Sequence, residues 1–210
     1  DKKEKLANEK LKLMVAEQNE AEKRREASIK LSQELDIKQG VIKERQAIVN
    51  QELEEAVPAL EKAKNAVSGI NPKDLNEMRK LLKPPELVKL TAEAVVSLLT
   101  GKVEKWDWKE VLAEMSKNTF MSSVLGFNSE KISAPLKKKL IDTYTAKPEW
   151  DIERIRRASQ VAGPLADWVT SQIKYADILT KVQPLRDEVA GLKKEEEVLL
   201  NKAKETNRND

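Results

Sequence analysis

A heptad repeat of apolar residues between positions 35 and 70 is the feature that most constrains how this chain can fold. One row of apolar residues recurs every seven positions, and a second row lies four positions after the first. The rows are Leu35, Ile42, Val49, Ala56, Ala63 and Ile70, and Leu53, Leu60 and Val67. This pattern predicts a long helix that pairs with another helix as a coiled coil.

A second heptad pattern occupies the C-terminal part of the chain. Its two rows are Tyr175, Val182 and Val189, and Ile178, Leu185, Leu192 and Leu199. Each pattern contains a proline, Pro58 in the first and Pro184 in the second. Because proline removes a backbone hydrogen bond and costs about 3 kcal/mol or more inside a helix, each proline should mark a special place in its helix.

The register of the first pattern is not settled by its residues. Gln39 and Gln46 are polar where the second row would continue, and buried polar residues weaken any single register. The adjacent apolar pairs 41–42 and 48–49 also offer another row, rotated by one residue from the first. Either these pairs are simple β-branched filling, or the helix can pair with its partner in two registers.

Proline and glycine divide the stretch between the two patterns into short helices. Asn71 before Pro72 predicts an N-cap with proline at the first helical position. The segment from Pro85 to Gly101 predicts a helix that is apolar around most of its circumference, and therefore the buried centre. Ser133 is expected to cap a later helix. About 95 residues in several short helices suffice for one small core.

The order of these segments predicts an all-α fold. Two long helices on either side of a small domain pair most simply with each other, antiparallel and within one chain. We therefore expect a long antiparallel two-helix coiled coil, or stalk, capped by a globular bundle of about six short helices. The expected domains are 1–70, the first arm, 71–163, the bundle, and 164–210, the second arm. The alternative is parallel homodimerisation through each heptad pattern.

Composition argues against catalysis in this chain. It has no His and no Cys, which excludes the usual zinc sites, cysteine nucleophiles and histidine-based triads. Asp and Glu are plentiful, but they follow the alternating charge patterns of solvated helix faces. We expect no catalytic residue, no metal site and no cofactor. The longest uncharged run is about a dozen residues, so the chain is expected to be soluble and not to span a membrane.

Basic residues predict a binding surface instead. Residues 65–165 hold 17 Lys and Arg against 13 Asp and Glu, a net charge of +4. On the helix expected after residue 151, Arg154, Arg156 and Arg157 fall outside the face of small and apolar residues. That face consists of Ile152, Ile155, Ala158, Ser159 and Ala162.

Other basic residues of the same region add to these arginines. They are Lys73, Arg79, Lys80, Lys117 and the run Lys137, Lys138 and Lys139. Each one alone is readily explained as solvated surface charge. As a set they predict a basic patch that binds an acidic partner with an affinity that falls as salt is added.

Five motifs follow one another along the chain. They are QNEAEK, AVSGINPKDLNEMRKLLKPPELVKLTAEAVVSLL, DWKEVL, RRASQVAGPLADWV and YADILTKVQPLRDEV. Together, and in this order, they resemble the stalk and microtubule-binding domain of dynein heavy chains, most of all the cytoplasmic form. The resemblance covers essentially the whole chain.

The resemblance implies part of a cytoskeletal motor protein, located in the cytoplasm on microtubules. ATP hydrolysis would take place in a distant AAA+ ring outside this chain. The bundle would grip the microtubule between α- and β-tubulin, and neither nucleic acid nor membrane is an expected partner. The family's contacts come from the first helix of the bundle, a short middle helix and the last helix. The matching positions are Lys73, Arg79, Lys117, Arg154, Arg156 and Arg157.

The family also implies a role for the prolines. Family stalks carry a proline in each arm near the bundle, and Pro58 and Pro184 match them. The family's proposed signal is sliding of one arm along the other by about half a heptad, between registers of strong and weak microtubule binding. Gln39 and Gln46 would help such a coiled coil to change register. The competing interpretation is a structural coiled-coil scaffold whose helical domain only reverses the chain.

Overall fold

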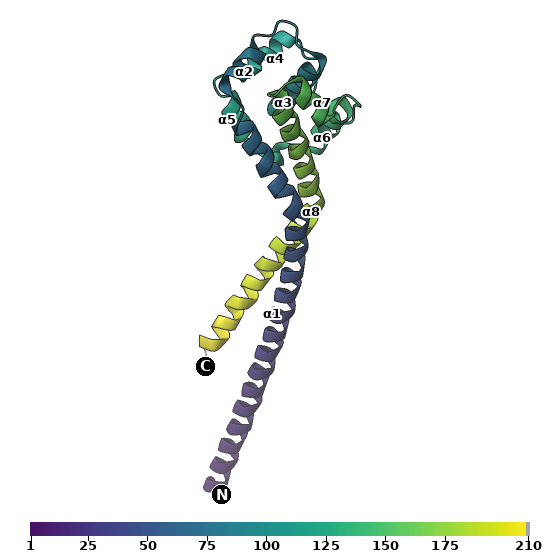
Figure 1. Cartoon of the computed structure of the whole chain (residues 1–210). Coiled ribbons are helices and arrows are strands. Elements are labelled where there is room, and N and C mark those ends of the chain that lie inside the picture. The colour runs from purple at the N-terminus through teal and green to yellow at the C-terminus, as the bar shows by residue number, and fades with distance from the viewer. Residues whose placement is uncertain (209–210) are drawn as a thin grey trace. The chain divides into compact units, whose positions relative to one another are not determined.

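Two long helices begin and end the chain in the computed structural model, which describes residues 1–208 (Figure 1). Helix α1 spans Lys2–Ser68 and helix α8 spans Ala162–Arg208, and residues 1–208 contain no β-strand. The elements between them are α2 (Pro72–Arg79), α3 (Glu86–Thr100), α4 (Trp108–Met115), α5 (Phe120–Leu125), the 3-10 turn η1 (Ser129–Lys131), α6 (Ala134–Leu140), the π-helical turn η2 (Ile141–Thr145) and α7 (Ile152–Ala158). The predicted all-α fold is confirmed.

Both interior prolines lie within continuous helices. Pro58 belongs to α1 and Pro184 to α8, and both are exposed. A proline ring on the outer face of a helix gives up a backbone hydrogen bond without disturbing the face that packs against a partner. The prolines therefore end neither helix, and their role in loosening the pairing stays a prediction.

The chain divides into two compact units, which are described separately. Unit 1 contains residues 1–49 and 184–210, and unit 2 contains residues 50–183. Both long helices contribute a segment to each unit. The predicted domain boundaries at 70/71 and 163/164 fall inside unit 2, close to Ser68 at the end of α1 and Ala162 at the start of α8. These boundaries stay a prediction.

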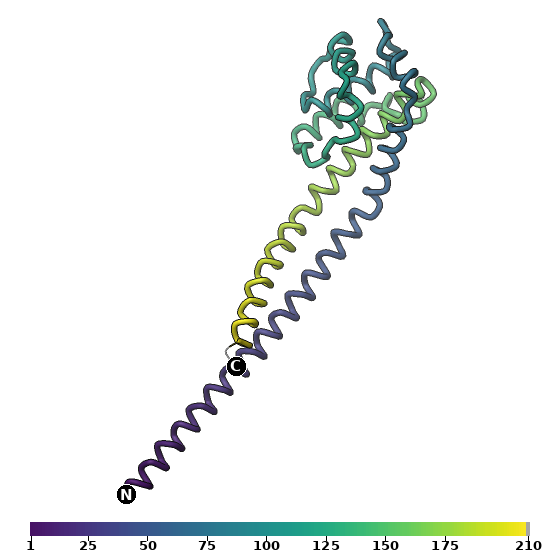
Figure 2. Tube along the Cα trace, turned by 90° about the vertical axis from the view of Figure 1, so that its left-hand side faces the viewer, coloured from purple at the N-terminus to yellow at the C-terminus, as the bar shows by residue number. Residues whose placement is uncertain are grey.

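Unit 1 consists of two antiparallel helical segments that lie side by side (Figure 2). Val49 of α1 is buried, as are Val189 and Leu199 of α8. Ion pairs join the two segments: Lys38 Nζ lies 2.6 Å from Glu195 Oε2, and Arg45 Nε lies 3.3 Å from Glu188 Oε1. The predicted antiparallel coiled coil is therefore confirmed.

The polar positions of this coiled coil differ from the prediction. Gln39, predicted at the paired face, is exposed, whereas its neighbour Lys38 is half-buried. The reason is that a long basic side chain can lay its methylene groups along an apolar surface while its charge reaches an acidic residue, here Glu195. Gln46 is half-buried, as is Arg45 beside it. Of the two glutamines, only Gln46 lies partly within the paired face.

The N-terminal part of α1 extends past the last described turn of α8 (Figures 1 and 2). Thr206 of α8 shares a shallow cleft with residues 21–29 of α1, which shows where the described pairing ends. Before this point α1 exposes several large apolar side chains. They are Leu6, Leu11, Leu13, Met14 and Val15.

Helix α3 is the centre of unit 2, as predicted. It contacts α4, α6, α7 and η2. Helix α3 begins and ends where the sequence predicts. Pro85 precedes its first turn, and Gly101 ends it in a left-handed conformation with a φ of 73°. Its buried residues are Val88, Thr91, Ala92, Ala94, Val95, Val96, Ser97 and Leu98. The short helices are therefore arranged around one apolar core.

The segments of α1 and α8 in unit 2 belong to the same core. Ala63 and Val67 of α1 are fully buried in it. Tyr175 and Ile178, predicted in the heptad rows of α8, are only half-buried. The buried residues of this part of α8 are Ala162, Leu165, Ala166, Trp168, Val169, Gln172, Ile173, Ala176, Leu179 and Val182. Val182 of the predicted rows is fully buried, as predicted. For Tyr175 and Ile178 the heptad prediction is wrong, because α8 packs against the short helices as well as against α1, which widens and rotates its buried face.

The four tryptophans pack within unit 2 rather than projecting from it. Trp168 is fully buried and stands edge-on to Phe127, with ring centroids 5.8 Å apart. The others donate indole hydrogen bonds: Trp106 to Ser97 Oγ at 2.8 Å, Trp108 to the Leu81 carbonyl at 2.8 Å and Trp150 to Thr170 Oγ1 at 3.0 Å. These bonds fix the connecting segments on which the candidate site is built.

Candidate functional site

Helix α2 carries the first predicted basic residues. The Asn71 side chain accepts a hydrogen bond from the Lys73 amide at 2.9 Å, and Pro72 occupies the first helical turn, as predicted. Leu75 and Met78 are buried and anchor one face of this helix to the core. Lys73 on the opposite side is exposed and forms no ion pair within residues 1–208. Its charge is therefore available to a partner.

Two clefts flank α2 and show what lies beside it. One, of about 450 Å³, is formed with Ser116, Lys117 and Asn118 of the α4–α5 turn and with α5. The other, of about 340 Å³, lies between α2, which contributes Asp74 and Glu77, and residues 158–161, which follow the arginines of α7. Helix α2 thus lies between the two other elements that carry predicted site residues. The fold brings the three predicted basic elements together.

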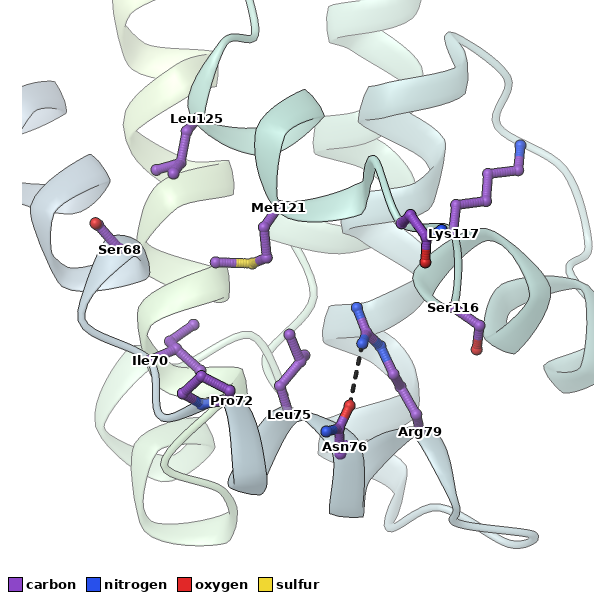
Figure 3. Close-up of a pocket in the computed structure, with 11 residues that line it drawn as sticks. Ser68, Ile70, Pro72, Leu75, Asn76, Arg79, Ser116, Lys117, Met121 and Leu125 are labelled. Atoms are coloured by element: carbon purple, nitrogen blue, oxygen red, sulfur yellow. Dashed lines mark hydrogen bonds between the residues drawn. The ribbon is translucent and has the colours of Figure 1, made fainter.

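Arg79 is oriented differently from a freely exposed contact residue. Its side chain extends from α2 toward the α4–α5 turn, and Nη1 donates a hydrogen bond to Asn76 Oδ1 at 3.2 Å (Figure 3). Its guanidinium carbon lies 5.8 Å from the centre of the Phe120 ring. Nε is buried and has no hydrogen-bond partner among residues 1–208. Arg79 therefore links α2 to α5.

Lys117 lies in the turn between α4 and α5, directly after the last turn of α4. Its side chain is exposed and points away from Arg79 (Figure 3). Its Nζ lies 2.9 Å from a carboxylate oxygen of Glu114, three residues earlier. An exposed pair of this kind contributes about 0–1 kcal/mol, so a partner can compete with it.

Helix α7 presents the three arginines. Asp151 caps it by accepting a hydrogen bond from the Arg154 amide at 3.2 Å, and the buried Ile155 anchors it. Arg154, Arg156 and Arg157 are all exposed. Only Arg156 of the three forms an ion pair within the described residues, at 2.9 Å from Glu153. Three cations on less than two turns of helix make this the most basic part of the site.

The end of α7 differs from the prediction. The helix ends at Ala158, so Ser159 and Ala162 do not continue its apolar face. Ser159 has an extended backbone, and its Oγ accepts hydrogen bonds from the amides of Val161 and Ala162 at 3.2 and 3.1 Å. It therefore caps the first turn of α8. Ser159 caps the next helix instead of continuing α7, and the periodicity of α7 alone does not reveal this role.

A close helix contact holds α7 in place. A Cβ atom added to Gly163, in the first turn of α8, would lie 3.0 Å from both Cα and Cβ of Arg156. A contact this short is tighter than most that Cβ atoms make, so a larger residue here would have to push Arg156 aside, and glycine lets α7 lie closest to α8. Sequence analysis missed this residue. Its signal was a glycine at the start of a long helix, where no turn requires one.

The acidic partners of several basic residues were also missed. Glu114 and Glu153 pair with site residues three positions away, a spacing that the sequence does contain. Lys137 of the basic run pairs with Asp177 of α8 at 2.7 Å, across 40 residues of sequence. Lys137 is therefore half-buried and structural, and it lies outside the candidate site.

Other kinds of site are limited by what the described residues contain. Among residues 1–208, no three acidic side chains are grouped so that they could hold a metal ion. Within the same residues, no helix has the length and apolar character needed to cross a membrane. The candidate site is thus a cationic surface formed by α2, the α4–α5 turn and α7.

Comparisons with known proteins show which family this chain resembles. The sequence model of a family described as the microtubule-binding stalk of dynein motor matches residues 1–208. A cytoplasmic dynein heavy chain of Paramecium tetraurelia is 46% identical over 202 residues, which are 96% of this chain and 4% of that protein. The corresponding protein of Neurospora crassa is 40% identical over 198 residues, 94% of this chain and 4% of its own length.

A solved structure extends the comparison to the fold. The microtubule-binding domain of dynein-c matches with a TM-score of 0.54 and 24% identity, over 65% of this chain and 94% of that one. The curated relatives are cytoplasmic dyneins, in agreement with the predicted cytoplasmic, microtubule-associated location. This chain spans about 4% of their length. Because the family model covers residues 1–208 and the sequence relatives cover nearly the whole chain, the chain belongs to the family of dynein microtubule-binding stalks.

Proposed function

We propose that unit 2 binds the microtubule through the cationic surface of α2, the α4–α5 turn and α7. The observation that carries this proposal is the exposure of Arg154, Arg156 and Arg157 on one short helix. Helix α2, on which Lys73 is exposed, lies across a cleft from the end of this helix. A patch of this kind attracts an acidic partner such as tubulin and makes its affinity depend on salt. The stalk itself is not catalytic.

Co-sedimentation with microtubules over a salt series tests this proposal. Changing Arg154, Arg156 and Arg157 to alanine keeps good helix formers on α7 and removes three positive charges. The affinity should fall by about tenfold or more, with a weaker salt dependence. A matched control changes Lys3, Lys5 and Lys10, three exposed lysines of α1, to alanine and should bind like the wild type. Equal losses in the two variants would show only a general effect of charge.

We further propose that the pairing of α1 and α8 sets this affinity and so couples it to an ATPase ring elsewhere in the full protein. Three ion pairs mark the present register. They are Lys38–Glu195, Arg45–Glu188 and Glu52–Lys181, and they step by seven residues along both helices. Sliding by half a heptad would break all three together. Since each exposed pair contributes only about 0–1 kcal/mol, a few kcal/mol from the ring would suffice to change register.

Cysteine crosslinking can report this change of register, because the chain has no cysteine of its own. Cysteines at positions 45 and 188 would lock the present register, and the locked protein should have a microtubule affinity different from that of its reduced form. Gln46→Leu should shift the crosslinking yield, whereas the exposed Gln39→Leu should not. If locking leaves the affinity unchanged, register does not control binding. A scaffold that only reverses the chain would show no salt-sensitive microtubule binding at all.

A further inference from the structure

The loop between α2 and α3 exposes an unusual side chain. Leu82 is 91% exposed, the highest value among the large apolar side chains described as exposed in residues 1–208. Lys80 and Lys83 on either side are also exposed, and no acidic residue lies between Met78 and Pro85. The loop therefore offers one apolar side chain between two positive charges.

The backbone of this loop is held in place on both sides of Leu82. The Leu81 carbonyl accepts the indole hydrogen bond of Trp108 at 2.8 Å, and the Leu81 amide donates to the Met78 carbonyl at 3.2 Å. Leu81 itself packs against the core. Pro84 and Pro85 restrict the backbone before α3 begins. The backbone on both sides of Leu82 is thus restrained, which lowers the entropy lost when a partner covers its side chain.

The loop also lies where the three basic elements meet. It follows α2 directly, and Trp108, which holds it, opens the helix that leads to Lys117. Leu81 and Pro85 line the same cleft as residues 158–161, which follow Arg157. The same cleft contains Asp74 and Glu77 of α2. The loop that carries Leu82 therefore borders the cationic surface described above, although no basic pattern identifies it.

A single exposed leucine is ordinary on a protein surface, and what distinguishes Leu82 is its position. The only other large apolar side chain described as exposed in unit 2 is Val57, 40% exposed and on α1. Protein interfaces combine a polar rim with a few buried apolar or aromatic anchors that supply most of the binding energy. The cationic surface has a charged rim, and Leu82 is the exposed apolar residue that borders it.

We propose that Leu82 is an apolar anchor of the microtubule-binding surface, inserted between apolar side chains of tubulin while Lys80 and Lys83 face its acidic residues. The proposal rests on the proposed function of unit 2. The charge of the loop favours this acidic partner over a second copy of the chain, whose loop would bring like charges together.

The test compares Leu82→Ser, Leu82→Met and the control Val57→Ser by microtubule co-sedimentation over a salt series. Serine and valine have similar helix propensities, so the control alters only an exposed apolar side chain. Leu82→Ser should weaken binding about tenfold without changing its salt dependence, because no charge is altered. Leu82→Met should stay within about threefold of the wild type, and Val57→Ser should match it.

The possible outcomes separate this proposal from the proposed function. If Leu82→Ser binds like the wild type while the triple arginine variant loses affinity, Leu82 is not an anchor and the cationic surface stands. If the wild type does not bind even at low salt, the proposed function fails and the anchor fails with it. If the wild type self-associates in analytical ultracentrifugation and Leu82→Ser does not, a second copy of the chain covers Leu82 and the proposal is wrong.

Discussion

Units 1 and 2 are built from the same two long helices but are stabilised differently. In unit 1, the buried apolar side chains among the described residues are Val49, Val189 and Leu199, with exposed ion pairs beside them. In unit 2, a continuous apolar core joins α1 and α8 to the short helices around α3. A helix pair with few buried contacts can change its local structure at a small cost in free energy, whereas segments that share a core cannot. Unit 1 is therefore suited to rearrangement, and unit 2 is suited to keeping a surface in shape.

The largest effect should come from truncating core leucines in the two units. Leu98 in α3 is 1% exposed and Leu199 in the coiled coil is 9% exposed. Leu98→Ala should cost about 2–5 kcal/mol of unfolding free energy, because the surrounding core cannot close the cavity. Leu199→Ala should cost less, since a helix pair can adjust. Urea unfolding followed by circular dichroism measures both, and equal losses would refute the difference between the units.

Glycine substitutions should have opposite effects in the two units. Gly163→Ala should cost about 1–3 kcal/mol, because its Cβ would press on Arg156 and displace α7. A Cβ added at Gly40 or Gly191 in unit 1 would meet no described atom within 4 Å. Gly40→Ala and Gly191→Ala should therefore each add about 0.5–1 kcal/mol of helix stability.

Thermal unfolding measures the stability of these variants, and microtubule binding gives a second measurement for Gly163→Ala. Its affinity should fall while the salt dependence stays that of the wild type, since all three arginines remain. A stabilising effect of Gly163→Ala would mean that α7 does not depend on this close contact.

Charge reversal in unit 1 should have a smaller effect. Replacing Glu188 and Glu195 by lysine places like charges opposite Arg45 and Lys38. The double variant should lose about 1 kcal/mol at low salt, and the loss should shrink in high salt as the charges are screened. Adding Lys38→Glu and Arg45→Glu restores opposite charges and should restore stability. No recovery in this swapped variant would mean that the pairs do not define the register.

The smallest effect should come from Glu93 on α3. Burial raises the pKa of Glu93 above its usual 4.5, against the lowering influence of Lys89 and Lys147. The folded state therefore holds this proton more tightly than the unfolded state, and stability falls as pH rises from about 4.5 through the raised pKa. Glu93→Gln should be slightly more stable than the wild type at pH 7 and equal to it near pH 3. A gain that is independent of pH would show that this carboxyl does not titrate as described.

Local sequence signals were sufficient for most of the fold. The heptad rows predicted the two long helices, because a period near 3.5 residues leaves one apolar face that has to be covered. Asn71 with Pro72, Gly101 and Ser133 marked helix ends, since each acts on backbone groups within three residues of itself. The all-round apolar character of α3 predicted its burial. The basic residues of α7 predicted an exposed charged helix.

Contacts between distant segments decided what the pattern could not. Arg79 lies over Phe120, 41 positions further along the chain, and this contact turns it away from solvent. Gly163 lets α7 lie on α8, and Ser159 leaves the face of α7 to cap α8. On α8, the buried face is broader than the heptad rows predict wherever α8 packs against the short helices as well as against α1. Which segments are helical and which face of each is apolar follows from the sequence alone, because both depend on neighbours within a few residues. Which cations remain exposed depends on distant chain segments that pack beside them, so it follows only from the folded structure.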